Sequence, residues 1–352
     1  MRKMKSKKGH NQLILDKQYF EKFFKSLTKK YKIFGPAEID NGNSLIEIDS
    51  LGKIKLDYTN TRISPKGFFF PETETLLTFD VETKKVIQKE TEEEVKDKNK
   101  ILFGIRPCDA LAISFLDKVF YDNEPVDPYY TKRRNSTRII SFACTNPRQS
   151  CFCTSVGFGP DGETGSDIIF FEMDGRYLIK TLTLEGEEIL EDAKGMLKVA
   201  MKKDLEEKER LMKKAKDRFK EIFEIEDLEK KVEQIDTSYW EKLHQKCLGC
   251  GICTYLCPTC HCFDITDEIF KSYGMRVRTW DSCMFPLFTL HASGHNPRPT
   301  LKERMKQRIM HKFNYSPKDY GETFCVGCGR CIIYCPVNMD IRKIIKEIVE
   351  EE

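Results

Sequence analysis

The chain has 352 residues, and its 59 Lys and Arg residues against 56 Asp and Glu residues leave a formal net charge of only +3. A nucleic-acid-binding protein would normally carry a large basic excess, and a membrane-spanning protein would carry a long apolar run that this sequence lacks. The basic start MRKMKSKKGH precedes the apolar patch Leu13–Leu15, which is too short for a signal peptide. We therefore expect a cytoplasmic protein with no nucleic-acid partner and no membrane insertion, in which thiols stay reduced.

The first part of the chain predicts strands and a helix. Residues 31–90 contain short apolar stretches that Asn, Gly and Pro interrupt, which is typical of β-strands. ETEEEVKDKNK (90–100) follows as a charged loop or helix edge, and ILFGI (101–105) as a short buried strand. The next segment, RPCDALAISFLDKVF, predicts a helix with Asp109 as its N-cap.

A second buried strand is RIISFAC (138–144), and residues 167–184 predict a β-hairpin with Asp174-Gly175 as its turn. The strand–helix–strand order across these segments is typical of an α/β domain. We therefore predict a mixed α/β domain over residues 1–184.

The remaining residues predict helices. Residues 185–236 are rich in Lys and Glu and predict a charged helical connector. In residues 237–352, Thr300 and Glu303 predict a capping box that opens an amphipathic helix, and IRKIIKEIVEEE closes the chain as another helix. The predicted fold class is α+β, a mixed α/β domain followed by a mostly helical one.

Fifteen cysteines at close spacing in a reducing compartment indicate metal ligands rather than disulfides. Two copies of the motif C-x-x-C-x-x-C-x-x-x-C-P stand in the last third of the chain. The first copy contains Cys247, Cys250, Cys253 and Cys257, and the second contains Cys325, Cys328, Cys331 and Cys335. Two zinc sites built from C-x-x-C pairs are the alternative, but duplication of the whole run with its proline favours two 4Fe–4S clusters.

The ligands of these clusters follow from a rule for two-cluster ferredoxins, in which the fourth cysteine of each run binds the other cluster. One cluster is therefore assigned to Cys247, Cys250, Cys253 and Cys335. The second is assigned to Cys325, Cys328, Cys331 and Cys257. The long interval between the runs, with its predicted helices, makes residues 237–352 a helical ferredoxin-like domain.

A third group of cysteines lies in the α/β domain. Cys108 stands at a strand-to-helix turn, and Cys144, Cys151 and Cys153 follow the strand RIISFAC. Ligands commonly bind where the carboxyl ends of parallel strands meet at one edge of a sheet. These four thiols predict a third 4Fe–4S site, with the alternative that Cys108 and Cys144 are small buried core residues.

Three cysteines remain, Cys260, Cys262 and Cys283. They stand in the stretch 260–295 together with His261, Asp281, His291 and His295. The residues leave three interpretations open: structural thiols near the clusters, a reactive dithiol, or ligands of a fourth cluster.

Taken together, these motifs resemble a known family. The chain is similar to the beta subunits of soluble sulfhydrogenases and to the A subunit of anaerobic sulfite reductase. The matching stretches are PETETLLTFD, GIRPCDALAISFLDKVF, DPYYTKRR, CTNPRQSCFCTSVGFGP, CLGCGICTYLCPTCHCF, WDSCMFPLF, and ASGHNPRP through CVGCGRCIIYCP, in the same order over most of residues 65–350. RPCD followed by LDKVF favours the hydrogenase side.

The resemblance implies an electron-transfer subunit of a soluble multi-subunit oxidoreductase. In such complexes a flavin-containing subunit reacts with NAD(P)H, and a hydrogenase or sulfite reductase subunit carries the terminal chemistry. A chain of this kind relays single electrons between the two through its 4Fe–4S clusters. The sequence offers no catalytic residues of its own, since it contains no convincing Ser–His–Asp or Cys–His nucleophile.

The alternative function is a reductase in its own right. In that case a cluster near residues 260–295 would bind and reduce a sulfur substrate, either a disulfide or sulfite. Turnover by the isolated chain with an artificial electron donor would distinguish this alternative from an electron-transfer subunit.

Overall fold

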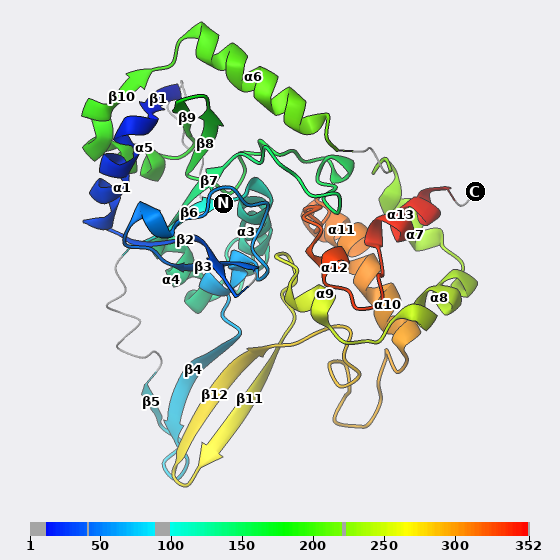
Figure 1. The fold of residues 1–352 in the computed structure, drawn as a ribbon. Coiled ribbons are helices and arrows are strands. Elements are labelled where there is room, and N and C mark those ends of the chain that lie inside the picture. Colours follow the sequence, from blue (N-terminus) through cyan, green and yellow to red (C-terminus); the bar gives the residue numbers. More distant parts are fainter. Residues whose placement is uncertain (1–11, 41, 89–98, 220–222, 351–352) are drawn as a thin grey trace. The chain divides into compact units, whose positions relative to one another are not determined.

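A computed structural model describes residues 12–40, 42–88, 99–219 and 223–350 (Figure 1). The chain forms two compact units, and both are discontinuous in sequence. Unit 1 comprises residues 1–65, 98–222 and 326–329, and unit 2 comprises residues 66–97, 223–325 and 330–352. The basic start and nearly all of the charged segment 90–100 lie outside the described residues. The domain limits expected at residues 184 and 236 stay a prediction.

Unit 1 contains an eight-stranded mixed sheet in the order β10-β1-β9-β8-β7-β6-β2-β3. Strands β2, β6, β7 and β8 run parallel to their neighbours within that group, and the other pairs are antiparallel. The strands are β1 (Gln12–Asp16), β2 (Lys32–Ile39), β3 (Gly42–Glu47), β6 (Lys100–Ile105), β7 (Thr137–Phe142), β8 (Ile168–Met173), β9 (Arg176–Thr181) and β10 (Leu197–Val199). The predicted strands β6 and β7 and the β8–β9 hairpin are confirmed. Strand β10 falls in the segment for which only helices were predicted.

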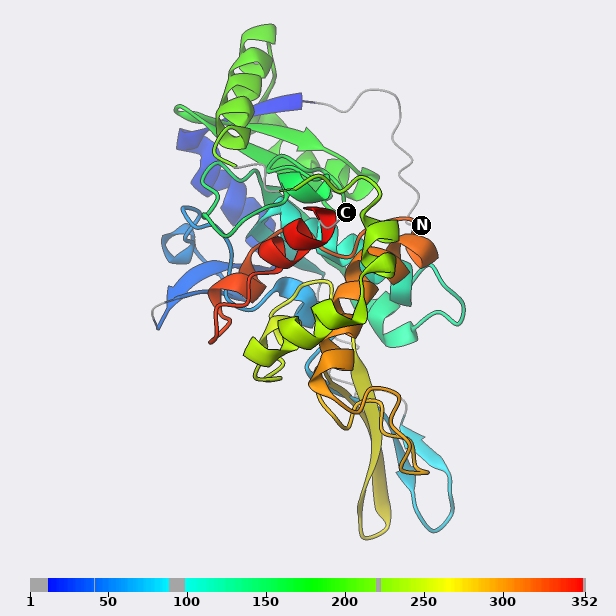
Figure 2. The ribbon, with the colours of Figure 1, turned by 90° about the vertical axis from the view of Figure 1, so that its right-hand side faces the viewer.

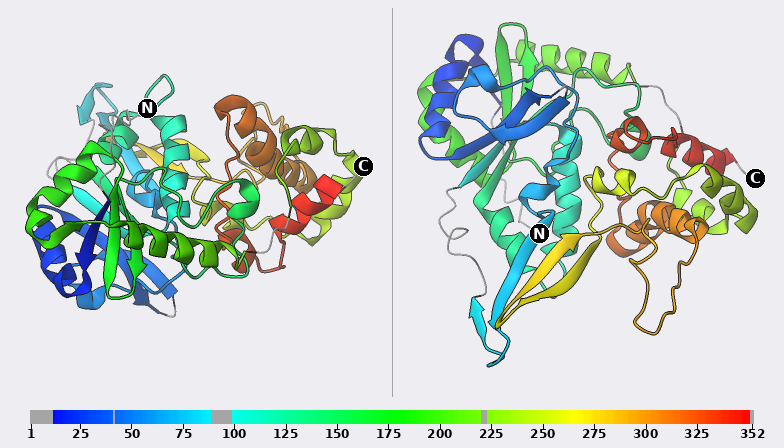
Figure 3. Two further views of the ribbon diagram at one scale, coloured as in Figure 1. Left: turned by 90° about the horizontal axis from the view of Figure 1, so that it is seen from above. Right: turned by 60° about the horizontal axis from the view of Figure 1, so that its bottom comes forward.

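Helices pack on both faces of this sheet (Figure 3). They are α1 (Phe20–Thr28), α3 (Pro107–Phe120), α4 (Pro128–Ser136), α5 (Leu184–Leu190) and α6 (Lys202–Lys216). Successive strand residues point to opposite faces, so Phe170 packs with α1 and α5 in one core cluster, and Phe171 packs with Met212 of α6 in another. This alternation explains why β8 is apolar along its whole length except Glu172.

Helix α3 begins differently from the prediction. Arg106, and not Asp109, is its N-cap, because Pro107 occupies the first helical position, where its fixed φ and missing N–H are tolerated. Asp109 lies in the first turn, buried. The guanidinium of Arg106 donates hydrogen bonds to the carbonyl oxygens of Leu56 (2.7 Å) and Ala143 (3.2 Å), and so holds this turn against the end of β7.

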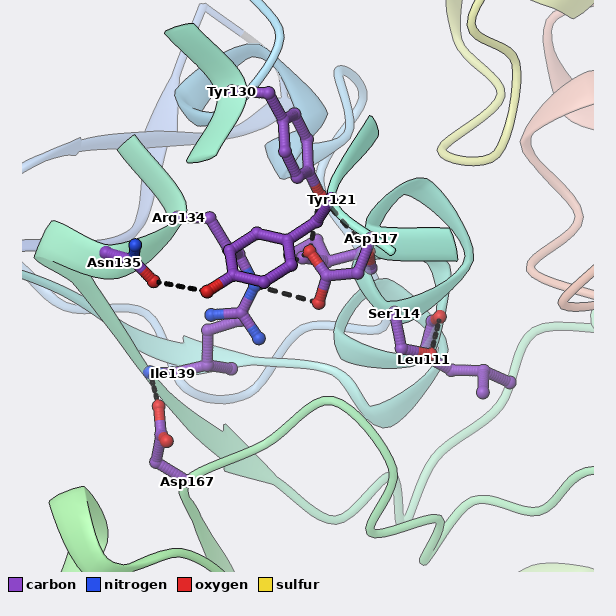
Figure 4. Close-up of polar contacts among 10 residues, drawn as sticks. Leu111, Ser114, Asp117, Tyr121, Tyr130, Arg134, Asn135, Ile139 and Asp167 are labelled. Carbon is purple, nitrogen blue, oxygen red and sulfur yellow. Dashed lines mark hydrogen bonds and ion pairs between the residues drawn. The ribbon is translucent and has the colours of Figure 1, made fainter. Parts of the chain in front are cut away.

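A buried polar network joins α3 to α4 (Figure 4). The Nε of Arg134 donates to both carboxylate oxygens of Asp117 at 3.0 Å, and the hydroxyl of Tyr130 donates to the same carboxylate at 2.7 Å. Burial, reinforced by the charge of Asp117, raises the pKa of Tyr130, which therefore stays protonated and serves as a donor. Both helices contact β7, so the network stabilises the position of α3, whose first turn contains Cys108.

Unit 2 contains a four-stranded antiparallel sheet in the order β11-β12-β4-β5 (Figure 2). The strands are β4 (Thr73–Asp80), β5 (Val86–Gln88), β11 (Phe263–Phe270) and β12 (Tyr273–Trp280). Strands in the region of β4 and β5 were predicted, but the β11–β12 hairpin falls in the domain that was expected to be mostly helical. The central pairing joins β12 to β4, which lies about two hundred residues earlier in the chain.

The helices of unit 2 are α7 (Leu228–Gln234), α8 (Thr237–Leu243), α9 (Ile252–Tyr255), α10 (Leu301–Met310), α11 (Ser316–Tyr320), α12 (Arg330–Ile333) and α13 (Ile341–Glu350). The predicted capping box of Thr300 and Glu303 opens α10 and is confirmed. A π-helical turn, His311–Tyr315, continues α10 directly. Within the described part of the chain, no helix is both long and apolar enough to span a bilayer. The predicted α+β class is confirmed.

Candidate iron–sulfur centres

The first predicted cluster site is a cavity of about 40 Å³ in unit 2. Four predicted ligands line it, together with one cysteine assigned to the other cluster: Cys247, Cys250, Cys253, Cys335 and Cys331. The remaining lining is mainly apolar and includes Met305, Ile309 and Ile344. The structure therefore brings the third and fourth cysteines of the second run to the first three cysteines of the first run.

Left-handed glycines shape the turns between these cysteines. In the first run, Gly249 and Gly251 have φ values of 67° and 72°, which favour glycine because it has no Cβ. A Cβ at Gly251 would lie 2.7 Å from the ring of Phe285, so this position also excludes a side chain. Backbone N–H groups then point at sulfur: Gly249 donates to the Sγ of Cys247 at 3.4 Å, and Met339 donates to the Sγ of Cys335 at 3.2 Å.

The donor set fits a thiolate-bound cluster. Burial raises the pKa of Cys247 and of Cys253, and the charge of Arg308 partly opposes the rise at Cys253. A buried thiol with a raised pKa becomes a thiolate when a metal binds it. N–H donors to ligand sulfur are the contacts by which proteins adjust the potential of an iron–sulfur cluster.

The ligands predicted for the second cluster belong to both units. Cys257, Cys325 and Cys331 are residues of unit 2, and Cys328 lies in the segment 326–329 of unit 1. In unit 2 the Nζ of Lys312 donates to the Sγ of Cys257 at 3.3 Å and to the carbonyl oxygen of Phe324 at 2.9 Å. The assignment of this cluster to four thiols stays a prediction from the motif.

The third predicted site is a small cavity of about 20 Å³ in unit 1. Its lining contains the four predicted ligands and one further cysteine: Cys108, Cys144, Cys151, Cys153 and Cys328. Cys108 lies in the first turn of α3 after β6, and Cys144 follows β7. These two strands are parallel neighbours, so the predicted meeting of their carboxyl ends is confirmed. Burial raises the pKa of Cys151 to about 11, so this thiol also needs a metal or a cation to ionise.

Cys328 is the residue of this cavity that the sequence reasoning missed. The thiol of Cys151 faces the carbonyl oxygen of Cys328 at 3.9 Å, and the side chain of Asn60 donates to the same oxygen at 2.8 Å. The N–H of Phe152 donates to the carbonyl oxygen of Gly327 at 2.8 Å. No local sequence pattern predicts the contact between Cys151 and Cys328, because the two residues are separated by 177 residues in the chain.

Replacing Gly327 by alanine should disturb the third site. Gly327 has a φ of +63°, and a Cβ there would lie 2.4 Å from the backbone nitrogen of Cys153. We expect the backbone of one of the two segments to shift, so that the purified variant retains less iron and sulfide per chain than the wild type. Gly294→Ala is the matched control, since Gly294 is also left-handed but has open space around its Cα. Equal iron content in the two variants would contradict this role of Gly327.

The three remaining cysteines, which we call the accessory thiols (Cys260, Cys262 and Cys283), lie in unit 2. The thiols of Cys262 and Cys283 are close enough to hydrogen bond, and those of Cys260 and Cys257 form a second such pair. The hydrogen bond with Cys283 lowers the pKa of Cys262 to about 7. The structure therefore places Cys260 beside Cys257, a predicted ligand of the second cluster.

The histidines of this stretch divide into two groups. His261 packs edge-on against His311 of unit 2 with ring centroids 5.3 Å apart, and burial lowers their pKa values to about 4 and about 3. Both imidazoles are therefore neutral at neutral pH. The second group is His291 and His295, which lie together in an exposed loop. The remaining polar residue of this stretch, Asp281, donates its backbone N–H to the carbonyl oxygen of Cys262 at 3.0 Å.

Single-ion sites are not formed by these side chains. Over residues 12–40, 42–88, 99–219 and 223–350, no three His, Cys, Asp or Glu side chains converge closely enough to hold one metal ion. A tetrahedral zinc ion needs its donors at about 2.0–2.3 Å from one centre. The thiols line cavities instead, an arrangement that suits a polynuclear cluster, whose ligands bind different iron atoms.

Sequence reasoning also missed three buried cations of unit 2, Lys66, Arg308 and Lys312. Their side chains lie among the thiols, and the residues are 3%, 5% and 4% exposed. Arg308 and Lys312 stand three residues after Met305 and Ile309, so they fall on the apolar stripe of α10 and its extension. A cation on such a stripe is the signal that could have revealed them. Lys66 carries no comparable signal.

The chain is similar to known proteins both in its cysteine-rich segment and over its whole length. The family model of the 4Fe-4S dicluster domain matches residues 246–339, which contain both cysteine runs. The whole chain is similar to sulfhydrogenase 2 subunit beta of Pyrococcus furiosus. The two sequences are 34% identical over 340 residues, which are 96% of this chain and 98% of that relative.

Proposed function

The chain belongs to the family of sulfhydrogenase beta subunits and contains a 4Fe–4S dicluster domain, and on this premise we propose that it is an electron-transfer subunit. It relays single electrons within a cytoplasmic, multi-subunit oxidoreductase of the hydrogenase type. Its partners are a flavin-containing subunit that reacts with NAD(P)H and a catalytic hydrogenase subunit. A catalytic sulfite reductase subunit in place of the hydrogenase subunit is the less favoured partner, because the chain belongs to the sulfhydrogenase family.

The observation that carries the proposal is the cavity lined by cysteines of both runs. Thiols from two runs, far apart in the chain, face one apolar cavity, and backbone N–H groups point at two of the sulfur atoms. A 4Fe–4S cluster takes up and returns one electron with little change of structure. The residues around it exclude water, hold its thiolates in place and supply hydrogen bonds to sulfur, and these contributions set a potential without taking part in bond making.

The third site extends the proposed relay into unit 1. Cys108, Cys144, Cys151 and Cys153 line the second cavity, and they would hold a third 4Fe–4S cluster. Cys328 lines the same cavity and is also a predicted ligand of the second cluster.

The test is iron content and reducibility of the full chain after anaerobic purification. Two clusters predict about eight irons per chain and three predict about twelve, with an equal number of acid-labile sulfides. Reduction with dithionite should give EPR signals from clusters that titrate reversibly. A chain with no reducible cluster would refute electron transfer. Reduction of sulfite or a disulfide by the isolated chain with a viologen donor would favour the reductase alternative.

A further inference from the structure

Strand β11 forms an open edge of the four-stranded sheet of unit 2 (Figure 1). It pairs with β12 on one side over all eight of its residues, without a register shift, and no described strand pairs with its other side. An edge strand of this kind turns every second N–H and carbonyl group away from its neighbour. The side chains are open as well, because residues 264–270 are exposed without exception.

The opposite edge of the same sheet is protected. Strand β5 spans only Val86–Gln88, follows Lys84 and Lys85 directly, and has a register shift in its pairing with β4. Short strands, lysines and bulges are devices by which proteins block pairing with a foreign strand. Strand β11 is as long as its neighbour β12 and contains neither lysine nor proline. The sheet therefore leaves one particular edge open to pairing.

The open edge also presents apolar side chains to solvent. Ile265 and Ile269 are 46% and 61% exposed, and they lie on one face of the sheet, because side chains an even number of residues apart in a strand share a face. Phe270, at the end of the strand, is 72% exposed on the other face. Removal of apolar surface from water is favourable, so these side chains favour contact of the edge with another protein.

The charges of β11 determine which strand can pair with it. The strand carries three carboxylates, Asp264, Asp267 and Glu268, and no cation. Asp267 is paired with Arg276 of β12. Asp264 and Glu268 lie on the other face, opposite uncharged residues of β12, and neither forms an ion pair with a described residue. Pairing of two copies of β11 would bring two sets of carboxylates together, which is destabilising, whereas a strand with Lys or Arg would be attracted.

We propose that the outer edge of β11 pairs with a strand of another subunit of the oxidoreductase, on which basic side chains alternate with apolar ones. The N–H and carbonyl groups of that strand bond to the open edge, which is the β-augmentation mode of recognition. Its basic side chains face Asp264 and Glu268, and its apolar side chains cover Ile265 and Ile269. The inference rests on the proposed function, because it requires a multi-subunit complex, and it adds the surface by which unit 2 joins that complex.

The first experiment compares amide hydrogen exchange in the isolated full chain with exchange in the complex purified from the natural host through a tag on this chain. We expect the amides of residues 264–270 to exchange about tenfold more slowly, or slower still, in the complex. Equal exchange in the two samples would overturn the inference, as would a dimer of the isolated chain formed through β11 or a chain that purifies without another subunit. Equal exchange leaves electron transfer intact, since that function fails only if no cluster is reducible.

Two matched double variants test the edge by substitution. Ile265→Lys with Ile269→Lys places lysines on β11, and Val86→Lys with Ile87→Lys places them on β5, in each case at exposed positions. We expect the β11 variant to lose its association with the other subunits, because lysines block an edge, and the β5 variant to retain it. The amount of partner subunit that co-purifies with each tagged chain measures the result. Equal association of the two variants would overturn the inference.

A third double variant, Asp264→Asn with Glu268→Gln, tests the predicted charge of the partner strand. We expect this chain to dissociate from the purified complex about tenfold faster than the wild type at low salt. The dissociation rate should also depend less on salt concentration, because the screened charge pairs are gone. A dissociation rate and a salt dependence equal to those of the wild type would overturn the assignment of a basic partner strand.

Discussion

Replacing Cys335 by serine should remove the same cluster as replacing Cys247, although the two residues belong to different cysteine runs. Both variants are expected to lose about four irons per chain and the same EPR signal, because the fourth cysteine of each run binds the cluster of the other. Cys335 lines the cavity formed by the first three cysteines of the first run. Iron analysis and EPR of the reduced proteins measure the result.

Cys331→Ser is the matched control for this prediction. Cys331 lines the same cavity as Cys335, but the motif assigns it to the second cluster. We therefore expect Cys331→Ser to remove the signal that Cys247→Ser retains. If Cys331→Ser and Cys247→Ser abolished the same signal, proximity would determine the ligands and the assignment of the two runs would be wrong.

Replacing Glu74 by glutamine should strongly destabilise unit 2. The Nε of Arg278 donates to a carboxylate oxygen of Glu74 at 2.8 Å, and both side chains are almost fully buried. The pair joins β4 to β12. Glutamine removes the negative charge that faces the guanidinium of Arg278, which lies over the rings of Phe70 and Phe263. Losing one partner of a buried ion pair costs about 3–5 kcal/mol of the free energy of unfolding.

The same sheet offers a control at its surface. Arg276 of β12 pairs with Asp267 of β11 at 2.8 Å, and both side chains are exposed. Asp267→Asn should change the free energy of unfolding little, because solvent screens an exposed pair. Denaturant titration followed by tryptophan fluorescence measures both variants, since Trp240 and Trp280 both belong to unit 2. Equal midpoints for Glu74→Gln and Asp267→Asn would show that burial of the Glu74–Arg278 pair contributes nothing to the free energy of unfolding.

Local patterns were sufficient for several parts of the fold. The buried strands β6 and β7, helix α3 and the turn at Asp174-Gly175 depend on residues close together in the chain. The cysteine runs are equally local, and they indicated iron–sulfur chemistry without any tertiary information. The prediction that Asp109 is the N-cap of α3 was wrong for a local reason too. The preference of proline for the first helical position outweighed the capping preference of aspartate.

Other features depend on contacts between distant segments, and no local pattern predicts them. Glu74 meets Arg278 across 204 residues of sequence, so neither residue reveals that it is buried or paired. The β11–β12 hairpin is largely exposed along β11, which weakens the alternation of apolar and polar residues by which strands are recognised. The position of Lys66 beside the accessory thiols likewise follows only from the folded chain.

The interleaving of the two units has a consequence for biosynthesis. The polypeptide leaves and re-enters unit 1, and its last contribution to that unit is the segment 326–329. The cavity that Cys108, Cys144, Cys151 and Cys153 line is completed by Cys328, so it cannot be whole until the ribosome has made residue 328. Domains usually fold from the N-terminus while synthesis proceeds. Here the insertion of metal into the thiols made first has to wait until the segment 326–329 has been made. A chain truncated before residue 328 would leave the ribosome with its first cysteines still unprotected.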